Sequence, residues 1–446
     1  MGAVIGRSAQ EGNGDVVSKP ARFHRSARDG QRTTYIGRLP RTLIAALVAA
    51  SLVACAGAQS AERASRSGGP TSAGAGAIST IATSSTPSGS LSGSYLVDLT
   101  WVSDATGWAL SAAPCGKALC ARISRTQDGG RSWTQLPAPP AHLSGSSAAT
   151  YCAVSPCVDH LRFATARIGY LFGPSLLITR DGGETWTAVA SPPVESLEPG
   201  PGAVVRLVYD HDGCPGPCNR MVEAAAAGSD DWRVLVANLT APSDADRAQI
   251  IRAGAGVIYV PIYGNLAAGA GPQQAVIYRS LDDGLSWTQL SDPCGGTGAA
   301  LRDAISIAAG SGGFLAALCT TRVISTYGYS VVSSLDYGVS WGARRPVPVT
   351  PAFSPDLIAA SGPNAMVITN SPAAGSGEYT YQLVLSTDRG RIWATVASDA
   401  RQLDPNAPYA TYLAFQGPLV GSWVGYPHAI WTTTDGGRLW TRRRFA

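Results

Sequence analysis

The stretch that decides the fold reads SLDDGLSW at residues 280–287, and five other stretches of the chain repeat its pattern. In each copy a serine or threonine, an aspartate, a glycine and a tryptophan stand at fixed offsets. The other copies are TQDGGRSW at 126–133, TRDGGETW at 179–186, SLDYGVSW at 334–341, STDRGRIW at 386–393 and TTDGGRLW at 433–440. Six copies of one eight-residue pattern indicate a repeat architecture.

The spacing of the copies predicts the number of repeats. The six aspartates are Asp128, Asp181, Asp282, Asp336, Asp388 and Asp435, at intervals of 53, 101, 54, 52 and 47 residues. One interval is about twice the others, so we expect a seventh, degenerate copy midway. The segment GSDDWRVLV from Gly228 lies there and keeps two acidic residues and Trp232 without the glycine between them. A period of about 50 residues is typical of a propeller blade.

Each copy predicts a tight turn between two β-strands. Alternating runs such as ARISRT and QAVIYRS precede the aspartate, and runs such as WTQL and WTAV follow it. The aspartate can accept backbone N–H groups, and the glycine can take the positive φ that the reversal needs. We expect the tryptophan to be buried against the neighbouring sheet. The six tryptophans are Trp133, Trp186, Trp287, Trp341, Trp393 and Trp440.

These turns resemble the Asp-box (BNR) repeat, the hairpin motif of sialidase-superfamily β-propellers. Glycine-aromatic passages upstream of the turns are similar to the blades of photosystem II assembly-factor-like propellers. They read VSDATGWAL around Trp108, ATARIGYLFG around Tyr170 and GSWVG around Trp423. The resemblance implies a propeller over most of the chain. Because the Asp box is structural in those families, it also implies that the boxes carry no catalytic residue.

Strand counting supports the same all-β fold, a seven-bladed β-propeller of four-stranded antiparallel blades over residues 94–446. The first blade reads as LVDLTWV, WALSAA, ARISRTQ and WTQLP, and the last as TYLAFQ, GSWVG, AIWTTT and WTRRRF. Both look complete, so we expect no interleaved strand to close the ring. Residues 195–240 fit least, and we expect a distorted or rebuilt third blade there. The 51 glycines and 30 prolines suit a fold of many short strands.

The segment before the propeller predicts export and lipid anchoring. Residues 1–54 combine a polar leader with the apolar run LIAALVAASLVA, which is too short to span a bilayer but suits a signal-peptide core. Leu52-Val53-Ala54-Cys55 resembles a bacterial lipobox, so we expect Cys55 to be acylated and the protein to sit outside the cytoplasmic membrane. If Cys55 is not acylated, the signal is an ordinary secretory one. Residues 55–93 are rich in Ser, Gly, Thr and Ala and predict a flexible tether of about 35 Å r.m.s. span.

The charge balance argues against a nucleic-acid partner. Residues 1–41 hold eight of the 34 basic and three of the 30 acidic residues, so the remainder has 26 basic and 27 acidic residues and a net charge of −1. A nucleic-acid-binding protein needs a basic face. We expect a monomer that binds a protein or an envelope component, without a cofactor.

The cysteines predict disulfides in an oxidising compartment. Besides Cys55 there are eight, mostly in close pairs: Cys115 and Cys120, Cys152 and Cys157, Cys214 and Cys218, and then Cys294 and Cys319. Zinc is the competing interpretation, but the spacings differ from the usual two-residue knuckles and the chain has only five histidines. We therefore expect no metal. Pairing is not determined by the sequence, because eight cysteines allow 105 connectivities.

A glycan-hydrolysing or glycan-binding propeller is the alternative function. Sialidase chemistry uses an arginine triad, a tyrosine nucleophile and an early Phe-Arg-Ile-Pro motif, and this chain lacks the motif. Paired-carboxylate chemistry needs two carboxyl groups close together. Asp210, Asp212, Asp303 or Asp356 could meet at the mouth of the ring, although nothing in the sequence selects them. The sequence therefore favours a binding or assembly scaffold over an enzyme.

Overall fold

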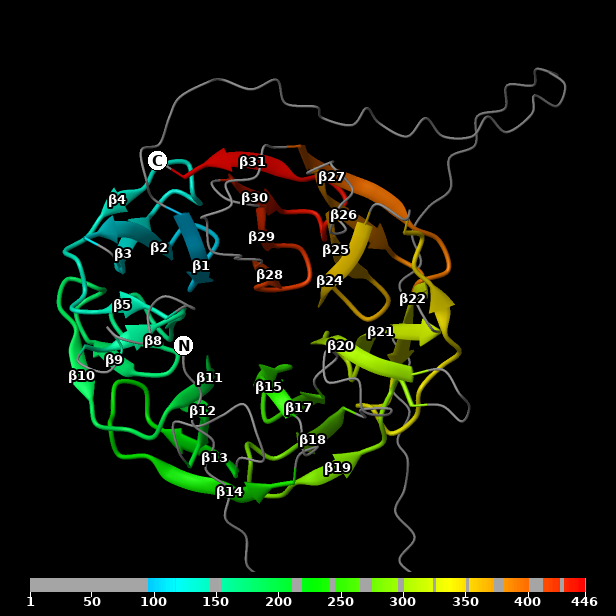
Figure 1. The fold of residues 1–446 in the computed structure, drawn as a ribbon, viewed down its shortest axis with the longest axis horizontal. Helices are drawn as coiled ribbons and strands as arrows, with labels where there is room; N and C mark the ends of the chain where they lie inside the picture. Colours follow the sequence, from blue (N-terminus) through cyan, green and yellow to red (C-terminus); the bar gives the residue numbers. More distant parts are fainter. Residues whose placement is uncertain are drawn as a thin grey trace, which may run out of the picture. The chain divides into compact units, whose positions relative to one another are not determined.

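The structure is a computed structural model, and it describes the chain from residue 95 to 445 with gaps at 117, 145–151, 153–154, 211–218, 241–244, 265–274, 296–300, 324–325, 350–352, 373–379, 401–411 and 426–428. The described residues form 31 β-strands in seven sheets, and the sheets are arranged as blades around a ring (Figure 1). The expected seven-bladed β-propeller is confirmed. The predicted signal segment, Cys55 and the predicted tether lie outside the described residues.

The first three blades follow one another along the chain. Blade 1 contains β1 (Tyr95–Trp101), β2 (Gly107–Cys115), β3 (Ala118–Thr126) and β4 (Thr134–Gln135), with β5 (His142–Leu143) and β6 (Cys157–Val158) added. Blade 2 contains β7 (His160–Phe163), β8 (Gly169–Phe172), β9 (Leu176–Thr179) and β10 (Thr187–Val189). Blade 3 contains β11 (Val194–Pro199), β12 (Val204–Tyr209), β13 (Arg220–Ala225) and β14 (Arg233–Leu239).

The remaining four blades continue around the ring. Blade 4 contains β15 (Ala245–Ala248), β16 (Ile251–Arg252), β17 (Ile258–Gly264), β18 (Val276–Ser280) and β19 (Thr288–Leu290). Blade 5 contains β20 (Leu301–Ala309), β21 (Leu315–Val323), β22 (Thr326–Ser334) and β23 (Arg345–Pro346). Blade 6 contains β24 (Phe353–Ala360), β25 (Met366–Pro372), β26 (Thr380–Ser386) and β27 (Ala394–Ala400). Blade 7 contains β28 (Tyr412–Phe415), β29 (Gly421–Gly425), β30 (Ala429–Thr433) and β31 (Thr441–Arg444).

Two blades depart from the sequence-based expectation. Blade 3 is an antiparallel sheet of four strands, although the turn between β13 and β14 has lost the repeated pattern. The β11–β12 pairing has one register shift, the β12–β13 pairing has none and the β13–β14 pairing has two. Blade 1 is larger than expected, because β5 pairs with β3 and β6 then pairs with β5 in parallel. Alternating apolar residues such as VVRLVY suffice to build a blade strand without a marker turn.

The ring closes by side-chain packing. Among the described residues every blade uses consecutive strands, and none of these strands is shared between the first and last blades. Leu96 and Leu99 of blade 1 share one apolar cluster with Val424, Ile430 and Phe445 of blade 7. Similar clusters join the other neighbouring blades. Burying apolar surface between blades is therefore the main force that holds the ring together.

Antiparallel blades place their connections on two opposite faces of the ring. We call the face with the first-to-second and third-to-fourth strand connections the turn face. The face with the second-to-third strand connections and the links between blades is the loop face. The six repeated turns all lie on the turn face, and in each a backbone N–H donates to a carbonyl of the other connection in its blade at 2.8–3.0 Å.

Candidate functional site

The repeated aspartates are occupied in building their own turns. Asp336 is representative: its Oδ1 accepts Ser334 Oγ–H at 2.7 Å and Ser340 N–H at 2.9 Å, and its Oδ2 accepts Ser340 Oγ–H at 2.6 Å. Ser334 Oγ in turn accepts Gly338 N–H at 2.8 Å. Hydrogen bonds from the Ser340 side chain and backbone lower the pKa of Asp336 to about 2. A carboxylate with these partners stays ionised at neutral pH and stabilises the turn.

The turn glycines allow close contact with the preceding blade. Gly390 has a φ of +83°, and a Cβ placed on it would lie 2.5 Å from Cγ2 of Val331 in blade 5. Gly338 likewise faces Leu290 of blade 4. The repeated glycine is therefore needed both for the reversal and for the seam between blades.

The turn tryptophans are less buried than expected. Trp440 is buried, whereas the other five are half-buried and cover the edges of the seams between blades. Trp186 and Trp287 donate Nε1–H to the carbonyl of the glycine in their own turn, at 3.2 and 3.0 Å. The fully buried aromatic residue in the first seam is Trp108, which stacks on Phe163 with ring centroids 3.8 Å apart and donates to Gly182 O at 2.9 Å. The deep packing role thus belongs to the glycine-aromatic passage.

A cluster of charged side chains lies on the innermost strands of blades 1, 2 and 3. We call it the inner-strand charge cluster, and it consists of Asp98 of β1, Asp159 and His160 at the start of β7, Arg162 of β7 and Glu198 of β11. The Arg162 guanidinium donates from Nη1 to Asp98 Oδ2 and from Nε to Glu198 Oε1, both at 2.8 Å. His160 Nδ1 lies 3.4 Å from the same Asp98 oxygen. Ion pairs therefore connect the innermost strands of three neighbouring blades.

Burial and pairing set the protonation of this cluster. Burial of Asp98 would raise its pKa, but Arg162, His160 and the Leu161 N–H together hold that pKa below its usual value. Burial would lower the pKa of Arg162, and the two carboxylates overcome this and raise it. Asp159 behaves in the opposite way to Asp98, because burial raises its pKa more than Ser144 and His160 lower it. The pKa of Asp98 is therefore lowered and that of Asp159 is raised. Tyr412 of blade 7 interacts electrostatically with Arg162, Asp98 and Glu198, and burial raises its pKa.

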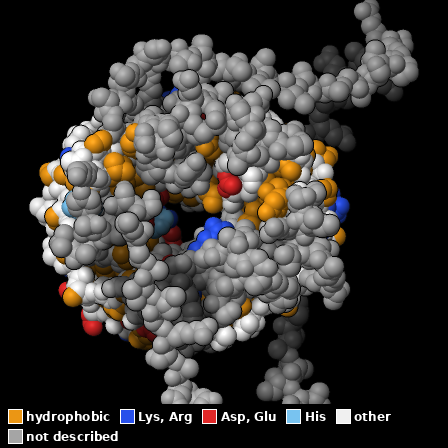
Figure 2. Space-filling model, viewed as in Figure 1, with side chains coloured by type: hydrophobic (Ala, Val, Ile, Leu, Met, Phe, Trp, Pro, Cys, Tyr) orange, Lys and Arg blue, Asp and Glu red, His pale blue; other side chains and the backbone are white. Residues whose placement is uncertain are grey.

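A second polar group lies on the first and second strands of blades 4 to 6. Arg247 donates to Ile305 O at 2.5 Å, and its guanidinium lies 4.8 Å from the Tyr263 ring centroid. Tyr263 Oη accepts from Gln249 at 2.7 Å. Asp356 accepts a hydrogen bond from Ser371, and its pKa is raised by burial. Figure 2 shows basic, acidic and histidine side chains around the hollow at the ring centre.

The carboxylates suggested by the sequence are not brought together by the described part of the structure. Asp210 is exposed at the end of β12 and accepts from Asn219 at 2.8 Å. Asp356 lies on β24, and the charged residue that influences it is Arg247. Asp212 and the side chain of Asp303 are outside the described residues. The sequence reasoning missed Asp98, Arg162 and Glu198, although charged residues inside apolar first strands such as LVDLTW could have indicated them.

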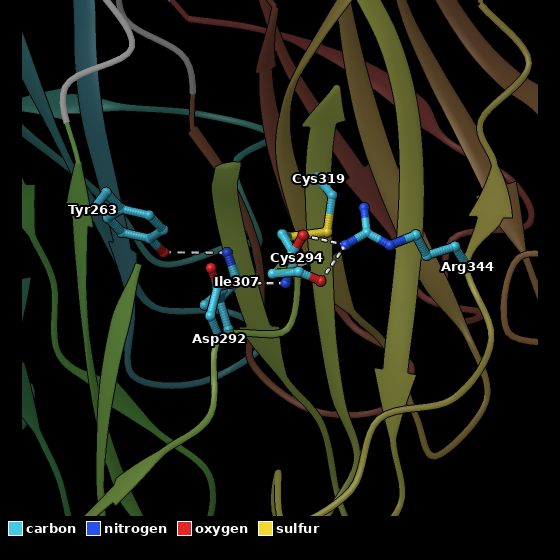
Figure 3. Close-up of a disulfide and its surroundings, with 7 residues drawn as sticks. Tyr263, Asp292, Cys294, Ile307, Cys319 and Arg344 are labelled. Carbon is cyan, nitrogen blue, oxygen red and sulfur yellow. Dashed lines mark hydrogen bonds between the residues drawn. A yellow bond between two sulfur atoms is a disulfide. The ribbon is translucent and has the colours of Figure 1, made fainter. Parts of the chain in front are cut away.

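Two of the disulfides among the described residues involve the sheet of blade 1, and a third involves blade 5. They join Cys115 to Cys120, Cys152 to Cys157 and Cys294 to Cys319. Cys214 and Cys218 are outside the described residues. The third disulfide ties the link between blades 4 and 5 to the centre of β21 (Figure 3). There Cys294 N–H donates to Asp292 at 2.8 Å, and the Arg344 guanidinium donates to the Cys294 and Gly295 carbonyls.

One group of described residues has the composition of a metal site. Cys115, Cys120 and His142 place their potential ligand atoms within 4.8 Å of one another. The two sulfurs are already bonded to each other, so they are not thiolates that could bind a metal. Within the described ranges, no helix is long and apolar enough to cross a membrane.

Comparison with known proteins gives structural similarity at low sequence identity. No family model matches the chain, and no curated protein matches it. A structure of YCF48 bound to D1 peptide aligns with a TM-score of 0.44 and 14% identity, over 79% of this chain and 94% of that one. The GH74 xyloglucanase from Xanthomonas campestris aligns with a TM-score of 0.49 and 14% identity, over 79% of this chain and 54% of that one.

A third similar structure is also that of an enzyme. The GH93 α-L-arabinofuranosidase of Fusarium graminearum, in complex with arabinobiose, aligns with a TM-score of 0.39 and 13% identity, over 78% of this chain and 93% of that one. This chain spans about half the length of the xyloglucanase. The propeller assignment therefore rests on the strand topology given above.

Proposed function

We propose that this protein is a lipid-anchored, extracytoplasmic propeller that binds a polypeptide or an envelope component at the inner strands around its ring centre and acts as a binding or assembly scaffold. The resemblance of the repeated turns to the Asp box supports placing it among the sialidase-superfamily propellers. Acylation at Cys55 holds it at the outer side of the bacterial cytoplasmic membrane, and the tether separates the ring from the bilayer.

The inner-strand charge cluster is the observation that carries the binding proposal. Arg162 and Glu198 remain partly exposed and His160 is about half exposed, while Asp98 behind them is buried and paired. A charged surface whose groups are held by ion pairs is preorganised for a polar ligand, because its side chains lose little freedom on binding. Its arginine is fixed between two carboxylates, which favours recognition over catalysis by that group.

Binding at this site is tested by capture with site variants. The lipidated protein is used to capture partners from membranes of the source cells, and the His160→Ala and Glu198→Gln variants are compared with it. Both residues are exposed enough for the fold to persist, and Glu184→Gln on the turn face is the matched control. We expect one polypeptide or envelope component that is lost with both site variants and retained by the control. Capture that is equal in all three variants would contradict binding at the cluster.

A glycan-acting propeller is the second candidate, and the contrast between Asp98 and Asp159 favours it. Two carboxyl groups whose environments separate their pKa values can serve as an acid and a base. Asp159 has the raised pKa that a general acid needs, and Asp98 has a lowered one. Hydrolysis of a sialoside or of a plant or bacterial glycan, abolished by Asp159→Asn, would overturn the scaffold function. A protein partner without turnover would exclude the enzyme.

The lipid anchor has its own test. Cys55→Ser removes the residue that would be acylated, so the protein should move from the membrane fraction to the soluble fraction. Globomycin, which blocks lipoprotein signal cleavage, should produce a larger precursor of the parent protein and leave Cys55→Ser unaffected. Retention of Cys55→Ser with the membranes after a high-salt wash, as firmly as the parent, would refute acylation as the anchor.

A further inference from the structure

Exposed apolar side chains gather on one part of the turn face. Eight of the ten large exposed apolar residues among those described lie on turns of blades 4 to 7, and we call them the turn-face apolar arc. They are Leu281, Leu285, Leu335, Tyr337, Val339, Ile392, Leu419 and Leu439. The turns of blades 1 and 2 carry Gln127, Arg131, Arg180 and Glu184 at the corresponding positions. Apolar patches on one side of a soluble protein mark interaction surfaces.

Four members of the arc stand at one of two adjacent positions in the repeated turns of blades 4 to 7. Leu285 and Val339 follow the turn glycine directly, whereas Ile392 and Leu439 stand one residue later. Leu285 is 75% exposed and Ile392 is 74% exposed, so both side chains project from the turn. Because the same turn recurs at the same end of each blade, these tips lie on one side of the ring, where a flat partner can reach all of them.

Two turns give up a stabilising bond to present these tips. In blades 1, 2, 4 and 5 a serine or threonine hydroxyl donates to the turn aspartate at 2.5–2.6 Å. Blades 6 and 7 have Ile392 and Leu439 at that position, so Asp388 and Asp435 lack this bond and are held by backbone N–H groups and one hydroxyl. An apolar residue that replaces a useful hydroxyl and stays in solvent is not explained by folding.

Arginines flank the arc on blades 6 and 7. Arg391 and Arg438 are exposed beside Ile392 and Leu439, and Arg389 is half-exposed in the same turn as Ile392. The Asp388 and Asp435 carboxylates of these turns already accept hydrogen bonds from their own backbone. Guanidinium groups beside apolar tips match a membrane interface, where phosphates lie above the acyl chains.

We propose that the turn-face apolar arc docks onto an anionic phospholipid bilayer, which orients the loop face away from the membrane. The proposal rests on the proposed anchoring for the choice of partner: a tether from Cys55 to Tyr95 brings the bilayer within reach. Forty residues extend to at most about 130–140 Å, enough to pass around the ring from β1. Tethering also raises the local concentration of the bilayer, so a few apolar side chains suffice for docking.

The test uses full-length mature protein with Cys55→Ser, so that no acyl chain contributes. Sedimentation with phosphatidylcholine vesicles, with and without phosphatidylglycerol, measures the partition constant. The variant replaces Leu285, Val339, Ile392 and Leu439 by serine, and we expect its partition onto the phosphatidylglycerol vesicles to fall at least about tenfold. The serines at 392 and 439 can restore the missing hydroxyl bonds, so the thermal midpoint should not decrease.

A matched control removes exposed apolar side chains outside the arc. Val234→Ser with Tyr327→Ser should partition like the parent, because Val234 lies on β14 and Tyr327 lies near the loop face. The proposal is overturned if the parent does not bind the anionic vesicles, if the arc variant binds equally well, or if the control loses as much. Self-association that the arc variant abolishes, without vesicle binding, would instead identify a second copy as the partner. None of these results depends on acylation or on capture by the inner-strand charge cluster.

Discussion

The turn face of this propeller and the rest of the ring are built in different ways. On the turn face, six turns share a core of hydrogen bonds between residues at most four apart in sequence, and four of them add a hydroxyl bond to the aspartate. Elsewhere, links of varied length carry disulfides, and charged residues from different blades meet on the inner strands. A repeated local motif can therefore fix the ring at its turns and leave the links and inner strands free to vary, and the inner strands are where we place ligand binding.

The largest effect is expected at a seam near the turn face. Trp108→Ala removes a fully buried indole that stacks on Phe163 and donates to Gly182 O in the next blade. Loss of this packing should lower the free energy of unfolding by about 3–5 kcal/mol, measured by urea denaturation. Trp232→Ala, at a half-buried tryptophan of the degenerate copy, is the control and should cost less. A loss for Trp108→Ala below about 1 kcal/mol would show that the turn-face seams do not hold the ring.

The next largest effect on stability is expected from the removal of a disulfide. Cys294→Ala with Cys319→Ala opens a link that spans 25 residues, and it should lower the free energy of unfolding by about 2–4 kcal/mol. Cys115→Ala with Cys120→Ala opens a span of only five residues and should cost less, since a shorter loop restrains the unfolded chain less. The same denaturation series measures both. Equal losses would contradict the chain-entropy explanation.

A single methyl group tests the geometry of the repeated turn. Gly390→Ala should destabilise by about 1–3 kcal/mol, because Gly390 has a positive φ and Val331 of blade 5 lies against it. Gly417→Ala is the control, since no heavy atom lies within 4 Å of the position where its Cβ would be. Thermal unfolding of both variants compares them. If the two midpoints fall equally, the glycine is not required by the seam.

The smallest expected effect is on the pH dependence of stability, which should differ between the turn carboxylates and Asp159. The turn carboxylates Asp181 and Asp336 have folded pKa values of about 2, below the usual 3.8, so they stabilise the fold above pH 4 and lose that contribution as the pH falls towards 2. Burial raises the pKa of Asp159, so its ionised form opposes folding at neutral pH, and acidification relieves this.

Two amide variants test whether the two kinds of carboxylate contribute to stability in opposite directions. Asp336→Asn should flatten the fall of the thermal midpoint between pH 4 and 2. Asp159→Asn should raise the midpoint at pH 7 and leave the fall at low pH unchanged. If Asp336→Asn shows the same acid-induced fall as the parent, the repeated carboxylates do not contribute through their ionisation.

The sequence predicted the architecture well because its signals are local. The serine, aspartate and glycine of each turn interact within four residues, so their spacing alone reveals the reversal. A 101-residue interval was enough to infer the blade without a complete motif, and β11 to β14 form it. Sequence patterns were less informative about depth of burial: the turn tryptophans were expected to be buried, yet only Trp440 is, because a residue next to a surface turn lies at the edge of the seam.

The candidate site could not be predicted because its residues meet only after ring closure. Asp98, Arg162 and Glu198 are separated by 64 and 36 residues, and nothing in their local sequence links one to another. The turn-face apolar arc could be predicted from the sequence only in part. Its residues are visible as variations within a known motif, but their exposure depends on which side of the turn faces solvent.

The sequence by itself determined the number of blades, the places where the chain reverses and the cysteines available for disulfides, because alternation and turn bonding act over a few residues. Only the tertiary structure decided which charges pair at the ring centre, which tryptophan fills a seam and which apolar side chains stay in solvent. Those outcomes depend on contacts between blades, and such contacts exist only once seven separately encoded sheets pack around one axis.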